Sequence, residues 1–379
     1  MRYPPQPVGN GPRVAVRRAA RRCPTTRKCQ EDPAPLPPRY GQQHCGNVRR
    51  LLNGRSLLDG TPTISSAQPK RILLTGTLAI DYVGTYPGVF TGLPQHRGIN
   101  LAIQLGRIER HFGGCAMNIA YTLKLLGDTP VPFVHVGRDF DSDYGAHLVA
   151  LGMDTSGIQV TDAPYSAHAF IFTDREQNQF TGFFGGPPVA EDFEQRIGRF
   201  ARGFDYAVLA PDLPEHMIPA ARALRKVGVP FLTDPGQNLT DFESSDAAEL
   251  TRLSDAVVVN EFEYETLRRH ARRPLDAVEL VIVTEGERGT RWRHRSDGDG
   301  HEPAVTAQIV DPTGCGDAFR AGFVHARLRS ASIAHAVRAG GVTAALALEA
   351  NGTQSHRCDG FASRYRDAWD THPPWLDAS

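Results

Sequence analysis

The stretch Val310-Asp-Pro-Thr-Gly-Cys-Gly-Asp-Ala-Phe-Arg-Ala-Gly-Phe323 carries the strongest signal in this 379-residue chain. We expect a short strand over residues 305–310 to run into a tight glycine turn that opens an amphipathic helix. Gly314 and Gly316 allow backbone N–H groups to face inward beside the helix N-terminus, where they can hold phosphate charge. The helix dipole would keep Asp317 ionised, so its carboxylate could accept a proton from a substrate hydroxyl.

A second stretch, Phe112-Gly-Gly-Cys-Ala-Met-Asn-Ile-Ala120, places a glycine pair before another helix start. Glycines allow a ligand to approach the backbone closely. The side-chain amide of Asn118 offers both a donor and an acceptor, which suits a sugar diol. Each stretch also has a purely structural interpretation, as a glycine turn followed by a helix cap, so neither decides the function alone.

Short apolar runs alternate with helical patterns from Arg71 onward. Ile119, Leu123 and Leu126 share one helical face, and Gly127 sits where a C′ glycine belongs. Runs that are apolar on both faces are typical of buried parallel strands; they cover residues 72–75, 131–136, 206–210, 230–233, 256–259 and 280–283. The alternation predicts an α/β fold with a central, mostly parallel sheet.

Residues 83–112 and 164–186 break this alternation, because they are rich in Gly, Thr, Gln and Phe and show no helical period. Residues 169–173 and 179–183 have the pattern of paired strands around a turn at 174–178. We therefore expect a small β lid over the carboxyl ends of the main sheet, where ligands bind in open α/β folds.

Residues 1–70 differ from the rest in composition. They hold 11 of the 28 prolines and 13 basic against 3 acidic residues, a net charge of +10, whereas the rest of the chain carries −10. Such a segment buries too little apolar surface to order itself, so we expect a disordered basic Pro/Arg-rich extension before a folded domain at 71–379. The acidic body argues against nucleic acid as a partner. No membrane span or secretory signal is visible, which predicts a cytoplasmic protein.

The two stretches together resemble the signatures of the ribokinase/PfkB family of carbohydrate and nucleoside kinases. The N-terminal signature G-G-x-x-x-N-x-A corresponds to residues 113–120. The C-terminal signature D-T-x-G-A-G-D corresponds to residues 311–317, with Pro312 and Cys315 in place of the commoner Thr and Ala. The resemblance runs from about 71 to 356. It implies a ribokinase-like three-layer α/β/α fold, with ATP and Mg²⁺ as cofactors.

The resemblance also implies a role for each site position. The substrate sugar would be bound by Asp81, Gly113, Gly114 and Asn118. The backbone amides of Gly314, Cys315 and Gly316 would form an anion hole, and Asp317 would be the general base. ATP would be bound by Asn260, Thr284, Gly286, Gly289 and Asn351. Glu263 would help to place Mg²⁺ through water, and the resemblance leaves open a K⁺ ion near Asp311 and Thr313.

Within the family, the chain looks most similar to the bacterial adenosine and nucleoside kinase branch, on residues 112–127, 234–237 and 311–317. This similarity implies phosphorylation of the primary (5′) hydroxyl of a nucleoside, with adenosine as the first candidate and purine salvage as the role. Phe170, Phe172 and Phe183 are candidates to stack on the base or to form lid core. His168 replaces the Gln expected in this branch, which bears on base preference.

Two alternatives stay open at this stage. One is a kinase for a free sugar of the ribose or fructose type. The lid segments hold few basic residues, which argues against a sugar phosphate as substrate but not against an uncharged sugar. The other is a non-catalytic nucleoside-binding protein, against which the retained Asp317 and glycines argue. A homodimer that pairs lid strands is a further expectation.

Overall fold

The computed structural model describes residues 68–93, 102–176, 178–270 and 275–376, all within one compact unit. The expected extension at residues 1–70 lies outside the described residues, except for its last three. No helix in the described ranges is both long and apolar enough to cross a membrane.

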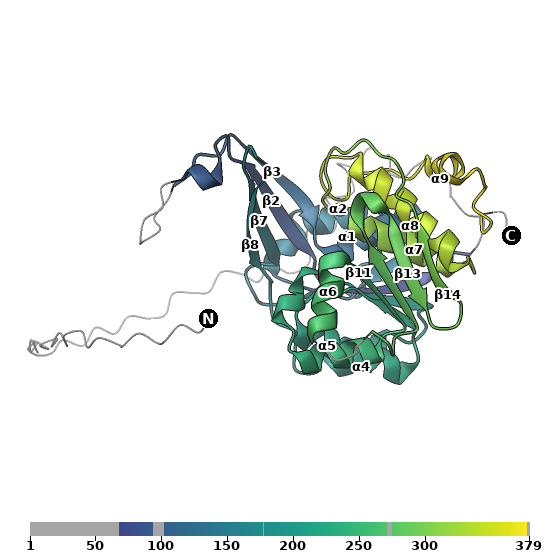
Figure 1. Ribbon diagram of the computed structural model, residues 1–379. Coiled ribbons are helices and arrows are strands. Elements are labelled where there is room, and N and C mark those ends of the chain that lie inside the picture. The colour runs from purple at the N-terminus through teal and green to yellow at the C-terminus, as the bar shows by residue number, and fades with distance from the viewer. Residues whose placement is uncertain (1–67, 94–101, 177, 271–274, 377–379) are drawn as a thin grey trace, which may run out of the picture. The chain divides into compact units, whose positions relative to one another are not determined.

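The main sheet has eight strands in the order β14-β13-β12-β11-β10-β9-β1-β4 (Figure 1). Neighbours from β12 to β4 pair in parallel, and only β13 and β14 are antiparallel, which confirms the predicted mostly parallel sheet. The strands are β1 (Arg71–Thr75), β4 (Thr129–Pro132), β9 (Tyr206–Leu209), β10 (Phe231–Thr233), β11 (Ala256–Asn260), β12 (Leu280–Thr284), β13 (Thr290–His294) and β14 (Gly298–Glu302).

Helices cover both faces of the sheet, because successive residues of each buried strand point to opposite sides. On β1, Ile72 and Leu74 pack with one helix layer, whereas Leu73 packs with the other. The first layer contains α1 (Cys115–Leu125), α2 (Tyr144–Ala150), α7 (Cys315–Arg327), α8 (Ile333–Leu348) and α9 (Phe361–Trp369). The second contains α3 (Phe193–Phe200), α4 (Pro214–Val227), α5 (Ser244–Leu253) and α6 (Glu261–His270). The result is the predicted three-layer α/β/α fold.

Helix α1 ends as the sequence predicts. Gly127 has φ +91° at the C′ position. Its N–H donates to the Lys124 carbonyl at 3.1 Å, and the N–H of Asp128 donates to the Leu123 carbonyl at 3.0 Å. These two bonds form a Schellman motif, which stops the helix and turns the chain back toward β4.

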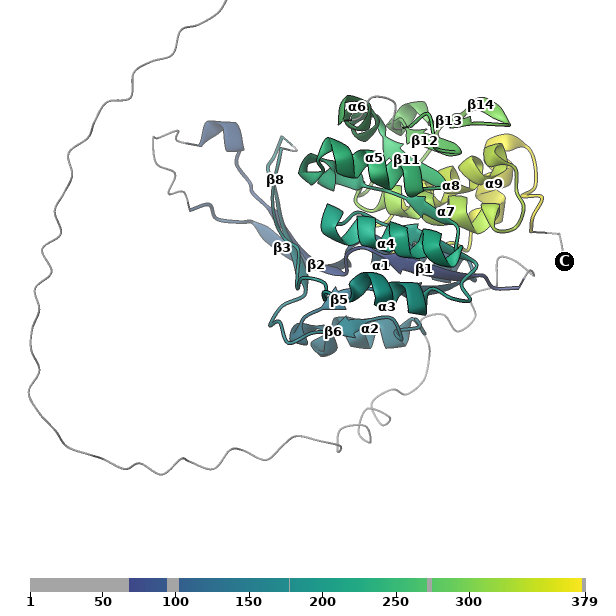
Figure 2. The same cartoon turned by 90° about the horizontal axis from the view of Figure 1, so that it is seen from below.

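The predicted β lid is a separate four-stranded sheet in the order β3-β2-β7-β8 (Figure 1). It projects to one side of the helices that cover the main sheet (Figure 2). Its strands are β2 (Ala79–Thr85), β3 (Arg107–Gly113), β7 (Ala167–Thr173) and β8 (Gln179–Phe184). The antiparallel pairing of β7 with β8 confirms the predicted hairpin. β2 begins four residues after β1 ends, and β3 is followed directly by α1. The lid is therefore connected to the main sheet at the carboxyl end of β1.

Two predicted strands differ from the structure. The run at 131–136 is divided between β4 and a short strand β5 (His135–Val136), which pairs with β6 (Gln159–Val160). β4 contains two prolines and lies at the edge of the main sheet, where the missing proline N–H groups are tolerated.

The strand expected at 305–310 does not form. Residues 303–309 have no regular structure, and Ile309 and Val310 are 61% and 54% exposed. The N–H groups of Val310 and Asp311 donate instead to the Leu348 carbonyl at the end of α8, at 2.8 and 3.2 Å. The sequence pattern predicted a strand here, but the end of this segment is hydrogen-bonded to the last turn of α8 instead.

Candidate active site

Helix α7 begins at the turn that the sequence singled out. Gly314 is its N-cap, with φ +78°, a conformation that favours glycine. A Cβ built at Gly314 would lie 2.9 Å from the Thr353 side chain, so the position is also sterically tight. Gly316 and Asp317 occupy the first turn, where N–H groups lack intrahelical partners. This turn can therefore present amide donors and the helix dipole to an anion.

Asp317 and Asn118 meet in the structure although 199 residues separate them in sequence. The Asn118 Nδ2 group donates to Asp317 Oδ2 at 2.8 Å, and both side chains are buried. Burial raises the pKa of Asp317 to about 6, while the Arg320 guanidinium and the Asn118 hydrogen bond oppose that rise. A carboxylate with this pKa is ionised at neutral pH and can still take up a proton.

Asp81 lies on lid strand β2, two residues after Ala79, the strand partner of Gly113. Gly113 is its close neighbour, and a Cβ there would fall 2.1 Å from Asp81 Oδ2, so only glycine fits. Gly114 has φ +89°, and its Cβ would meet the Thr77 carbonyl at 2.4 Å. Burial, reinforced by the Asp317 carboxylate, raises the pKa of Asp81 to about 7.

Gln354, which the sequence placed with Asn351 at the nucleotide end, and Tyr144, to which it gave no role, connect these groups. Gln354 Nε2 donates to Asn118 Oδ1 at 3.1 Å and to the Tyr144 hydroxyl at 2.7 Å. The Tyr144 hydroxyl in turn donates to the Gly113 carbonyl at 2.8 Å. Gln354 has φ +56°, an unusual conformation for a residue other than glycine, and such strain is concentrated at functional sites. The only sequence clue was the place of Gln354 after the Asn351-Gly-Thr segment.

Arg320 and Asp234 form a second pair that the sequence did not reveal. Both side chains are buried, and the Arg320 Nε group contacts Asp234 Oδ2. One signal was present in the sequence, since Arg320 is a lone charged residue in the apolar run from Ala318 to Val324.

The residues expected at the nucleotide end lie on neighbouring strand ends. Asn260 ends β11 and is paired in register with Thr284, the last residue of β12. Asn260 Oδ1 accepts the Glu263 N–H at 2.9 Å, and Glu263 Oε2 accepts the Asn260 N–H at 2.8 Å. This reciprocal pair is a capping arrangement for α6. Gly286, with φ +59°, follows in the turn after β12.

The other predicted nucleotide residues form turns. Gly289 has φ +101°, and a Cβ there would fall 2.1 Å from the Glu302 carbonyl, so the close approach to β14 requires glycine. Asn351 follows α8 and is exposed. The Asp311 carboxylate accepts the Thr313 N–H at one oxygen and the Gly352 N–H at the other, both at 2.9 Å. Asp311 thus ties the signature turn to the segment after α8.

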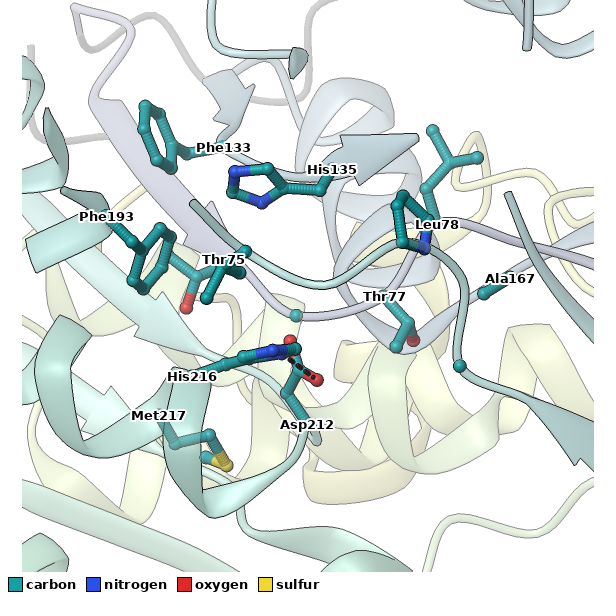
Figure 3. A pocket seen from close by; sticks show the side chains of 14 residues that line it. Thr75, Thr77, Leu78, Phe133, His135, Ala167, Phe193, Asp212, His216 and Met217 are labelled. Carbon is teal, nitrogen blue, oxygen red and sulfur yellow. Dashed lines mark hydrogen bonds and ion pairs between the residues drawn. The ribbon is translucent and has the colours of Figure 1, made fainter. Parts of the chain in front are cut away.

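A pocket opens beside the Asp81 site, at the carboxyl ends of β1 and β9. Figure 3 shows Thr77, His135, Phe193 and His216 around it, with Asp212 bonded to His216. The His216 Nδ1 group donates to Asp212 Oδ1 at 2.9 Å. Burial alone would lower the pKa of His216, but Asp212 raises it above the ordinary value. Burial lowers the pKa of His135 to about 4, so that ring is neutral.

Strand register assigns the lid aromatics to two faces. Residues directly opposite each other in adjacent strands point to the same side. Asp81 is opposite Ala169, and Ala169 is opposite Phe183, so Phe183 shares the face of Asp81. Phe170 and Phe172 alternate with Ala169 and face away. Of the three candidates, Phe183 therefore lies on the Asp81 side of the lid sheet, and Phe170 and Phe172 lie on the other side.

The acids near Asp317 suit a magnesium ion that is held mainly by phosphate. Within the described ranges, no three His, Cys, Asp or Glu side chains are placed to ligate a metal ion together. Magnesium in nucleotide sites usually takes one or two carboxylates, several waters and phosphate oxygens. Glu263 is buried, and its charge acts on both Asp317 and Asp234, so it is the acid best placed for that role.

Comparison with known proteins identifies the class. A nucleoside kinase of Methanocaldococcus jannaschii is 28% identical over 302 residues, 76% of this chain and 93% of that protein. A solved Burkholderia thailandensis nucleoside kinase with inosine is 32% identical and superposes with a TM-score of 0.70, over 80% of this chain and 100% of that one. Fructokinase-2 of Oryza sativa subsp. japonica is 27% identical over 287 residues, 69% of this chain and 81% of that protein.

The fold and the site thus define an ATP-dependent phosphotransferase with an alcohol acceptor. The sequence profile of the pfkB family carbohydrate kinases matches residues 70–358, and the chain belongs to this family. The resemblance to nucleoside kinases that the sequence indicated is confirmed.

Proposed function

We propose that the protein phosphorylates the primary (5′) hydroxyl of a nucleoside, with ATP as the phosphoryl donor. The observation that carries this proposal is the meeting of Asp81, Asn118 and Asp317 at the N-terminus of α7. A sugar diol fits between Asp81 and the Asn118 amide, which leaves the primary hydroxyl directed at Asp317.

The residues have separate roles in the transfer. Asp317 accepts the proton of the attacking hydroxyl as the new P–O bond forms and the bond to the ADP oxygen breaks. The amides of Gly314, Cys315 and Gly316 stabilise charge on the transferring phosphoryl group. Asn260, Thr284, Gly286, Gly289 and Asn351 would hold the nucleotide. A magnesium ion near Glu263 would supply further neutralisation of phosphate charge.

Similarity to nucleoside kinases supports a nucleoside rather than a free sugar as the acceptor. Adenosine is the first nucleoside that we would test, since the sequence similarity points to that branch.

The test is ADP release from Mg-ATP by the purified protein with adenosine, inosine, guanosine, cytidine, ribose and fructose. Turnover confined to nucleosides supports the proposal, and their ranking identifies the base. Turnover with ribose or fructose alone would replace the proposed substrate by a free sugar. Nucleoside binding without turnover of any acceptor would instead favour a nucleoside-binding protein.

A monovalent cation beside Asp311 and Thr313 is also part of the proposal. Both Asp311 oxygens already accept backbone N–H groups, so such an ion would act on the loop that these bonds hold. We expect the turnover rate in KCl to be higher than the rate in the same concentration of tetramethylammonium chloride. Equal rates in both salts would remove the ion from the mechanism.

We further propose a homodimer through the lid, in the cytoplasm. Ile108, Phe170, Phe180 and Phe184 share the lid face opposite Asp81, and all are more than 40% exposed. A cluster of exposed apolar side chains usually marks an interface. Sedimentation should give a dimer for the wild type and a monomer for Phe180→Glu, and a wild-type monomer would contradict this proposal.

A further inference from the structure

Arg320 is a buried cation that the proposed reaction does not yet use. It lies one helical turn after Asp317 in α7, and its side chain is 7% exposed. Asp234, which follows β10, contacts its Nε group and also accepts the Gly236 N–H at 3.0 Å. Arg320 is thereby anchored to the end of a central strand.

Several acids surround this one guanidinium. The carboxylates of Asp234, Asp317 and Glu263 all act on it electrostatically, and they come from three different elements. Its Nη1 group also lies under the signature turn, 2.8 Å from the position that a Cβ on Gly316 would occupy. A fixed positive charge therefore sits directly behind the proposed anion hole.

Stability alone gives little reason for such an arrangement. Desolvation of a buried ion pair often costs more than the attraction returns, and apolar replacements are frequently as stable. A buried arginine beside three carboxylates therefore points to a role in the chemistry of the site.

We propose that Arg320, anchored by Asp234, is a positioning residue that holds the Asp317 carboxylate and the signature turn ready for phosphoryl transfer. The inference rests on the proposed phosphotransfer at Asp317. The proposed role is exerted through Asp317, on which the guanidinium acts electrostatically.

Electrostatics supports the same role. Burial raises the pKa of Asp317, and Arg320 is the largest influence that opposes this rise. The other groups that act on Asp317 or Asp81 across the site are Asn118 and Cys115 of α1, Glu263 of α6 and the Asp317–Asp81 pair itself. Without Arg320, the acids would raise the pKa of Asp317 further, so less of it would be ionised near neutral pH.

The test is the pH dependence of kcat in Arg320→Met, which removes the guanidinium and leaves the surrounding acids in place. At saturating substrates, kcat reports groups of the bound complex, which separates Asp317 from Asp81. We expect the apparent pKa on the acidic limb of the kcat profile to rise by about one unit, because a neighbouring opposite charge is lost. An equal loss of rate at every pH, with the limb unmoved, would show a purely structural pair and overturn the proposal.

Arg329→Met is the matched control. Arg329 follows α7 and is equally buried, and its Nη2 group bonds Asp128 at 2.9 Å, far from the signature turn. This variant should lose thermal stability and keep the wild-type limb. A shifted limb in Arg329→Met would mean that any buried charge loss has the same effect, which would also overturn the proposal.

A second variant decides the question if Arg320→Met does not fold. Arg320→Lys keeps the charge but loses the fixed fork of the guanidinium. We expect the acidic limb to stay in place while kcat falls about tenfold, because the charge remains but the positioning is lost. Unchanged kcat would contradict the positioning role. Whichever acceptor the wild type turns over serves as substrate, so failure with nucleosides alone would refute the proposed substrate and not this inference.

Discussion

At the residue scale, the site depends on carboxylates that burial makes hard to ionise. Asp317→Asn should fold normally and bind substrate with little change in KM, since the amide keeps the shape of the side chain. We expect kcat to fall on the order of 10²–10⁴-fold, the usual contribution of a general base. Steady-state assays with circular dichroism as a folding check would measure this, and near-normal turnover would rule out the role.

Asp81 leads to a prediction about stability. Its pKa is about 7 in the fold against 3.8 in the unfolded chain, so the folded state binds more protons between these values. The stability that this proton uptake provides is present below about pH 4 and is lost as the pH rises through 7. At pH 8, the free energy of unfolding of Asp81→Asn should therefore exceed that of the wild type by on the order of 2 kcal/mol.

Urea unfolding at pH 8 and pH 4.5 measures this effect. The gain of Asp81→Asn should shrink at the lower pH, where the wild-type carboxyl is protonated as well. An equal gain at both pH values would exclude the carboxylate charge as the cause. The same variant should lose kcat/KM for the acceptor, which would show that the site gives up stability for binding.

The sequence identified the site residues that belong to motifs, and it missed those that act through packing. Asp317, Asn118 and Gly114 stand in patterns with a recognisable mechanism. Gln354 and Tyr144 do not, because their role depends on contacts across more than 200 residues of chain. No local pattern encodes a contact of that kind.

At the element scale, the turn between β3 and α1 should tolerate no side chain at its second glycine. Gly114→Ala would force a Cβ to within 2.4 Å of the Thr77 carbonyl and would strain φ at +89°. We expect a loss of more than about 2 kcal/mol in unfolding free energy, from backbone strain and overpacking together. Urea unfolding measures the loss.

Gly203→Ala is the control for the backbone contribution. Gly203 has φ +87°, almost the same value, but nothing lies within 4 Å of a Cβ there. Its substitution should cost only about 1 kcal/mol. Equal losses at both glycines would show that the Thr77 contact does not matter.

The sequence predicted the buried strands correctly. It failed where contacts with distant parts of the chain determine the backbone conformation. The runs that form β1, β9, β10, β11 and β12 are apolar on both faces, and central burial makes that pattern reliable. The run at 305–310 also contains Thr306 and Gln308, and it is held by the end of α8. β-branched residues alone cannot distinguish a strand from an exposed segment that hydrogen-bonds to a helix end.

At the scale of the whole molecule, the kinase should not need its N-terminal extension. The family match begins at residue 70, and Lys70 already bonds the body through Asp128 Oδ1 at 3.2 Å. Deletion of residues 2–67 should therefore leave kcat within about twofold and the melting temperature nearly unchanged. Differential scanning fluorimetry and the kinase assay would measure both.

Deletion of residues 2–73 is the matched control. It removes Ile72 and Leu73, which are fully buried in the central strand β1 between β9 and β4. This shorter protein should not fold. A large loss of activity in the first deletion would instead show that the extension contributes to the kinase itself.

The placement of Asp81 on β2 has a consequence for how this enzyme can diverge. Asp81 and Phe183 belong to the lid sheet, whereas Asp317, Arg320 and Asp234 belong to the body. If the proposed roles hold, selection can remodel the lid, and with it the choice of acceptor, while the residues proposed for phosphoryl transfer are inherited intact. Exchange of lid segments between relatives is accordingly a direct route by which new acceptor preferences could arise from one ancestral scaffold.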